Sequence, residues 1–82
     1  MPTVHRFAGL RVVVYPNDHR PAHVHVIGSD AEAVFFLNSD GPGVILRENY
    51  GFPSHAINRI ETALNAVHGE LCRAWESIHG QP

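Results

Sequence analysis

Three histidines lie within one short stretch near the start of the chain, and their spacing could support chemistry. The stretch Asp18–Val26 reads DHRPAHVHV and contains His19, His23 and His25, three of the seven histidines in the 82-residue sequence. His23 and His25 are separated by one residue in a β-branched run, so on a strand their side chains share a face, with Cα atoms about 6–7 Å apart. Two imidazoles placed in this way can bind one metal ion, or act as acid and base on opposite sides of a phosphodiester.

Neighbouring residues extend this candidate site. His19 lies in the preceding loop, which a proline stiffens, and could supply a third imidazole; Arg20 could bind a phosphate through its forked guanidinium. The candidate ligand- or phosphate-binding residues are therefore His19, Arg20, His23 and His25. His23 and His25 are the catalytic candidates, and His19, His23 and His25 are the candidate ligands for a divalent transition metal such as Zn, Ni or Cu. Asp18 is the nearest carboxylate, and we expect the turn to occupy it.

A purely structural interpretation uses the same residues. His23 and His25 would then be half-buried sheet residues bonded to their neighbours, in a small interaction domain that works as a dimer through its helix. This interpretation predicts that alanine at His23 lowers stability and leaves binding intact. Phosphate or RNA binding, metal binding and packing all stay open on these residues alone.

The elements that must position the cluster are short strands. Within HVHVI, His23, His25 and Ile27 share one face, and Val24 and Val26 take the other. Apolar, β-branched runs alternate with turn residues up to position 48, which is typical of an antiparallel sheet. The pattern predicts four or five strands within residues 3–48, at 4–7, 10–15, 23–27, 31–37 and 44–47, with a turn over 38–43.

A long amphipathic segment follows the sheet. Apolar residues recur at spacings of three and four from Ile57 to Ile78, and this predicts one helix over 54–79, with Ser54 as its N-cap and Gly69 inside it. Such a helix would be close to 40 Å long at about 1.5 Å per residue. The predicted fold class is α+β, with an antiparallel sheet of four or five strands and one long C-terminal helix packed on one face. The other face would be open to water, a partner or a ligand.

Composition narrows the class of protein. A chain of 82 residues predicts a single domain over 1–82 with a marginal core, so a second copy could supply buried area in a homodimer. One cysteine, Cys72, excludes an internal disulfide and suits a reducing cytoplasm. No segment approaches the roughly 18 apolar residues of a membrane span, and we expect no membrane contact. A net charge of -2 argues against strong non-specific nucleic-acid binding.

Two adjacent phenylalanines indicate what the sheet faces contact. Phe35 and Phe36 point to opposite faces of one predicted strand, so one lies under the helix and the other on the outer face. An outer aromatic can stack on a base, but it more often fills a protein interface. Trp75 extends the apolar stripe of the helix and is expected in the core or between protomers.

The motifs resemble those of a family of short bacterial proteins defined only as a domain of unknown function, the 4160 family. The resemblance covers nearly the whole chain and departs from the family pattern at Ala22, where a second proline is usual. It rests on four stretches: Val12–Tyr15, Asp18–Val26, Leu46–Asn49 and Glu70–Glu76.

The resemblance implies a gene context rather than a chemical mechanism. Family members are often one half of a two-gene pair, which suggests a toxin–antitoxin or similar regulatory module with a partner protein encoded nearby. The function expected from it is binding of that partner, and of RNA, through the histidine-rich sheet site. If the protein were a toxin-like ribonuclease, His23 and His25 would be the acid–base pair and Arg20 the phosphate clamp, without metal.

Overall fold

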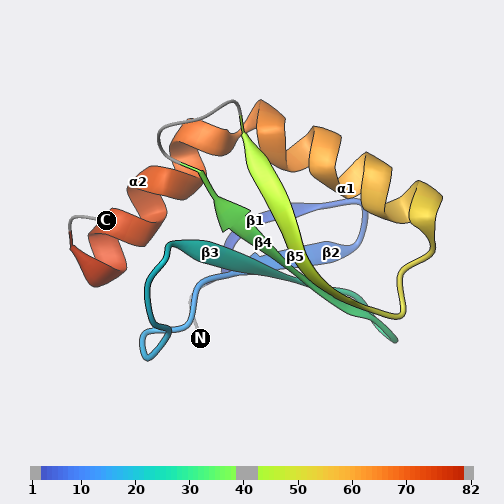
Figure 1. The fold of residues 1–82 in the computed structure, drawn as a ribbon, viewed down its shortest axis with the longest axis horizontal. Coiled ribbons are helices and arrows are strands. Elements are labelled where there is room, and N and C mark those ends of the chain that lie inside the picture. The colour runs from blue at the N-terminus through green and yellow to red at the C-terminus, as the bar shows by residue number, and fades with distance from the viewer. Residues whose placement is uncertain (1–2, 39–42, 81–82) are drawn as a thin grey trace.

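The computed structural model describes residues 3–38 and 43–80, so the ends of the predicted domain and most of the predicted turn over 38–43 lie outside the described residues. Five antiparallel strands pair in the order β1-β2-β3-β4-β5, which is their order along the chain. Two helices lie on one face of this sheet (Figure 1). The antiparallel sheet and the α+β class are therefore confirmed. The elements are β1 (Thr3–Phe7), β2 (Leu10–Val13), β3 (His23–Ile27), β4 (Glu32–Leu37), β5 (Val44–Tyr50), α1 (Ser54–Ala66) and α2 (His68–His79).

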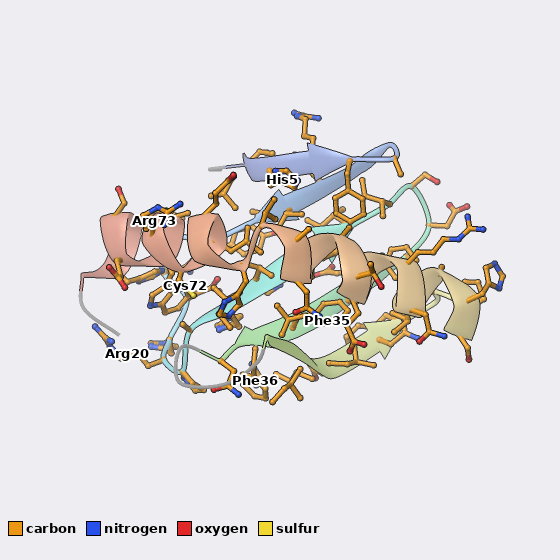
Figure 2. The ribbon with its side chains drawn as sticks, turned by 90° about the horizontal axis from the view of Figure 1, so that it is seen from above. His5, Arg20, Phe35, Phe36, Cys72 and Arg73 are labelled. Atoms are coloured by element: carbon orange, nitrogen blue, oxygen red, sulfur yellow. The ribbon has the colours of Figure 1, made fainter. Side chains whose placement is uncertain are left out.

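The core lies between the sheet and the helices, and strand alternation decides which residues enter it. Val24 is opposite Phe35 and Val26 is opposite Ala33 across β3 and β4. All four side chains are fully buried and belong to the same hydrophobic cluster. Because residues directly opposite each other in an antiparallel pair share a face, the intervening histidines of β3 belong to the other face. Phe35 lies beneath the helices, whereas Phe36 does not (Figure 2).

The outer face is less open than expected beside His25. Val13 is opposite His25 on one side and Val34 is opposite it on the other. Although both valines lie on the face away from the helices, Val13 has no exposed surface and Val34 retains 4%. The His25 ring therefore lies between two buried valine side chains rather than on a solvated sheet surface.

The prediction of one continuous helix is wrong, because the helical segment breaks at Val67, with φ -119° and ψ 22°. Val67, His68 and Gly69 are three weak helix formers in succession. The molecule is 33 Å across at its widest, whereas an unbroken 54–79 helix would extend about 39 Å. The break lets both halves remain on the sheet, with α1 and α2 at an angle to each other (Figure 1). Each half buries its own part of the stripe, namely Ile57, Ile60 and Leu64 on α1, and Leu71 and Trp75 on α2.

The start of the first helix also differs from the prediction. Pro53 occupies the N-cap position, and Ser54 is the first helical residue. No side chain caps this end; instead, the carbonyl oxygen of Pro53 accepts hydrogen bonds from the N–H groups of Ala56 and Ile57.

Strand β5 forms one edge of the sheet and is longer than the predicted 44–47. Its pairing with β4 shifts register, so that Val34 is opposite Glu48 while Phe35 is opposite Leu46. Arg47 is thus the extra residue of a β-bulge, a feature that re-aims a side chain at a sheet edge.

Candidate functional site

The loop between β2 and β3 is held by its own hydrogen bonds. The Asp18 N–H donates to the Tyr15 carbonyl oxygen at 3.0 Å, and the Tyr15 N–H donates to Asp18 Oδ2 at 3.0 Å. These reciprocal bonds fix the Asp18 carboxylate relative to the end of β2. The Asp18 carboxylate does accept a hydrogen bond within the turn, as expected, but it also has further partners.

Asp18, His23 and His25 converge on one point. The Nε2 atoms of His23 and His25 lie 3.5 Å and 3.3 Å from Asp18 Oδ2, and the centroids of the two imidazole rings are 5.2 Å apart. One donor atom from each of the three residues can be chosen so that all lie within 4.8 Å of one another. The side chains are largely buried, with 14% of Asp18, 6% of His23 and 16% of His25 exposed. The arrangement is therefore a compact Asp–His–His cluster, sheltered from bulk water.

The other nitrogen of each ring is bonded to an oxygen acceptor. The His23 Nδ1–H donates to the Pro21 carbonyl oxygen at 2.8 Å. His25 Nδ1 lies 3.2 Å from Glu32 Oε2, where an N–H can donate to the carboxylate. Because a carbonyl oxygen only accepts, the first of these bonds requires the proton of His23 to be on Nδ1. Both rings thus turn Nε2 toward Asp18.

The C-terminal half of the helical segment holds this loop in place. The Trp75 ring lies 5.3 Å from the His23 ring and stacks on the His79 ring at 4.0 Å. The His79 Nε2–H donates to the Tyr15 carbonyl oxygen at 3.0 Å, and Arg20 Nη2 lies 3.4 Å from the His79 carbonyl oxygen. Figure 2 shows Arg20 beside the end of α2. The last turns of α2 therefore contact both the His23 ring and the loop that carries Asp18.

A cavity of about 340 Å³ opens beside the cluster. It brings together all four residues singled out from the sequence, namely His19, Arg20, His23 and His25. His19 is exposed and does not belong to the Asp–His–His group, so the structure does not support it as a third ligand equivalent to the other two. In the part of the chain that the structure describes, the lining residues are Asn17, Asp18, His19, Arg20, Pro21, His23, His25, Phe36 and Arg47.

Two site residues were missed by sequence reasoning. Glu32 reaches His25 because the short hairpin between β3 and β4 sets Glu32 opposite Ile27, two residues from His25 on the same face. The Gly28 turn signals that hairpin, so the register could have indicated Glu32. Arg47 reaches the cavity through the bulge in β5, with its guanidinium carbon 5.5 Å from the centroid of the Phe36 ring. Nothing in the local sequence marks that bulge.

The histidines outside the cluster have other neighbours. His5 packs against Phe7 on β1, and His55 is exposed on α1. His68 Nε2 lies 3.7 Å from the sulfur of Cys72, one helical turn further on. Burial raises the pKa of the Cys72 thiol, with a smaller contribution from Glu76, so the group is held as a thiol rather than a thiolate.

Fold and site together define a small α+β domain, a five-stranded antiparallel meander under two helices, with an Asp–His–His cluster at one end of the sheet. The chain belongs to the family described as "Domain of unknown function (DUF4160)", whose profile matches residues 9–76. This range includes the cluster and Trp75. No curated protein and no solved structure matches the chain. Among the described residues, no helix has both the length and the apolar character needed to cross a membrane.

Proposed function

We propose that this domain binds one divalent transition metal ion through Asp18, His23 and His25, with coordination positions left open toward the cavity. The observation that carries the proposal is the orientation of the two imidazoles. Each has Nδ1 against an oxygen acceptor and Nε2 against the same carboxylate. Asp18 thus takes the place that the sequence suggested for His19.

Proton assignment favours a cation at this point. A neutral imidazole carries one N–H, and in His23 that proton is on Nδ1. Its Nε2 then presents a lone pair to the Asp18 carboxylate, which is an unfavourable contact in a largely buried site. His25 has the same difficulty, since both of its nitrogens face carboxylates. A second proton on a ring, or a cation between the Nε2 atoms and the carboxylate, would relieve these contacts.

The distances favour the metal over the extra protons. Charge-assisted N–H···O bonds are about 2.7–2.9 Å long, whereas the two Nε2···Oδ2 separations are 3.5 Å and 3.3 Å. Two ligand atoms on a tetrahedral ion with bonds of about 2.0–2.1 Å are separated by about 3.3–3.4 Å. Together with the 3.4 Å from His25 Nε2 to Asp18 Oδ1, these separations are long for charge-assisted hydrogen bonds and lie close to the edge of a metal coordination polyhedron.

The surroundings also suit a metal centre. Histidine ligands usually donate their second ring N–H to a backbone carbonyl or a carboxylate, which fixes the tautomer. Pro21 and Glu32 occupy those two places here. Two neutral imidazoles and one carboxylate suit Zn, Fe, Ni or Cu, and three protein ligands leave room for a water or a ligand.

The test uses the full chain purified without a histidine tag and stripped of metal. Calorimetric titration with Zn²⁺ should give one ion per chain. Cu²⁺ or Ni²⁺ should quench the fluorescence of Trp75, the sole tryptophan, whose ring lies 5.3 Å from that of His23. Asp18→Asn and His25→Gln should each weaken binding at least about tenfold, whereas His55→Gln on the exposed face of α1 should not. Equal affinity in all variants, or much less than one ion per chain, would overturn the proposal.

The regulatory role expected from the family resemblance is a separate proposal, with a partner protein, a second copy of the chain and RNA as its binding partners. Ile45, Leu46 and Tyr50 on β5 are the large apolar side chains that stay exposed among the described residues. The edge strand that carries them is where a protein partner would be sought. RNA binding is favoured by a specific feature of the cavity, the two arginines on its wall.

A further inference from the structure

We infer that the cavity beside the Asp–His–His cluster is a phosphate-binding site, in which Arg20 and Arg47 bind the phosphate group of a phosphate ester and one phosphate oxygen faces the metal. The contact with the metal rests on the proposed function. The arginine contacts do not, because they require only the cavity wall.

The charge of the cavity differs in sign from that of the chain. The whole sequence carries a formal charge of -2. Among the described residues, those that line the cavity include two arginines and one carboxylate, Asp18. A divalent ion on Asp18 would make the excess of positive charge larger still. An anion is therefore the ligand that this wall attracts, and the partly enclosed shape strengthens the attraction.

Both arginines are available to a ligand. Within the described residues, no carboxylate lies within ion-pair distance of either guanidinium; the ion pairs found there all involve histidines. Arg20 has one long contact, at 3.4 Å, with the His79 carbonyl oxygen, and its side chain is exposed. This leaves most of its planar donor fork free, and that fork matches the oxygens of a phosphate.

Arg47 is directed to the cavity by backbone geometry. As the extra residue of the β5 bulge, it has no direct partner on β4, and its guanidinium lies over the Phe36 ring at 5.5 Å. A cation–π contact of this kind orients the guanidinium while leaving its N–H groups exposed at the edge. Arg20 and Arg47 reach the cavity wall from two separate segments, a loop and an edge strand.

The volume of the cavity limits the size of the ligand that it can hold. Ligand pockets span roughly 300–1,000 Å³, and this cavity, at about 340 Å³, is at the lower end. It can enclose a phosphate with one attached group of modest size. Phe36 supplies apolar surface for that group. A single nucleotide unit, free or within a single-stranded RNA, meets these limits.

The experiment measures phosphate binding with and without metal. Inorganic phosphate, a nucleoside 5′-monophosphate and a short single-stranded RNA are titrated by calorimetry into metal-free and Zn²⁺-loaded protein. We expect binding that weakens about tenfold in Arg20→Gln and in Arg47→Gln, the loss expected for one charge-assisted contact, and that is unchanged in Arg59→Gln on the exposed surface of α1. Circular dichroism checks that each variant is folded.

The outcomes separate this inference from the metal proposal. Phosphate binding that depends on both arginines but not on Zn²⁺ supports the arginine site even if the metal site fails. Zn²⁺ binding without any phosphate binding, or phosphate binding that Arg59→Gln weakens as much as Arg47→Gln, overturns the inference. Tighter binding of the RNA than of the monophosphate assigns the phosphate to an RNA chain, and equal binding assigns it to a free nucleotide; both support the site.

Discussion

The substitution Asp18→Asn separates a metal centre from a protonated histidine pair, because the two predict opposite effects on the metal-free protein. Asparagine retains an oxygen that can accept the Tyr15 N–H, so the loop keeps its hydrogen bond. It removes the negative charge, and its NH₂ group, in the place of Oδ1, can donate to the lone pair on His25 Nε2. If the two rings are neutral, the substitution replaces an unfavourable contact by a hydrogen bond.

The expected magnitudes follow from this local chemistry. In metal-free protein, the free energy of unfolding should stay within about 1 kcal/mol of wild type or rise, since one neutral hydrogen bond is gained. If instead the rings are imidazolium ions paired with Asp18, the substitution leaves largely buried charge without its partner and should destabilise by roughly 3–5 kcal/mol.

In the presence of Zn²⁺, wild type should instead be more stable than Asp18→Asn. At free Zn²⁺ of about 100 times the dissociation constant, wild type gains about 2.7 kcal/mol, which in a domain of this size raises Tm by roughly 10–20 °C. A hundredfold loss of affinity in Asp18→Asn would reduce that gain to about 0.4 kcal/mol at the same Zn²⁺ concentration.

The assay is thermal and urea unfolding with and without Zn²⁺. Asp30→Asn, in an exposed turn, is the matched control and should behave as wild type. A loss of several kcal/mol in metal-free Asp18→Asn, or an unchanged Zn²⁺ effect in that variant, would refute the neutral-ring, metal-binding interpretation.

Three further predictions concern residues of α2. Trp75→Ala should lower the free energy of unfolding by about 3–5 kcal/mol in urea denaturation, because a fully buried ring is removed from the core; a loss below 1 kcal/mol would contradict its place there. His79→Ala should lower stability by about 1 kcal/mol through the lost bond to Tyr15 and should weaken Zn²⁺ binding, which calorimetry can measure; unchanged affinity would mean that α2 does not position the loop. Cys72 should react with iodoacetamide more slowly than a free cysteine at pH 8, since burial raises the pKa of its thiol, and urea should restore the normal rate; equal rates before and after unfolding would be inconsistent with that burial.

Local patterns were sufficient for some features of this protein and not for others. Alternation in HVHVI placed His23 and His25 on the same face, away from Val24 and Val26, because side-chain direction on a strand has a period of two. The core strands and the apolar helical stripe follow from the same kind of periodicity.

The remaining features depend on contacts that local patterns do not report. The apolar phase continues through Val67, so periodicity alone could not reveal the break; comparison of a helix of about 40 Å with the expected sheet width could have. The local pattern predicts only a turn role for Asp18, whereas its carboxylate also lies beside both imidazoles. Arg47 depends on a bulge and on the pairing of β5 with β4, which are long-range properties.

The loop that carries Asp18 is anchored through Tyr15 to His79, 64 residues later in the chain. During synthesis, Asp18 and both imidazoles are made before the α2 residues that hold their loop in place. Because contacts between distant segments form only after both have been made, the finished site would assemble after translation has passed His79. Binding of the proposed metal by the finished site would then follow the synthesis of α2, and termination within α2 would yield a chain with every proposed ligand but without the contacts that hold their loop in place.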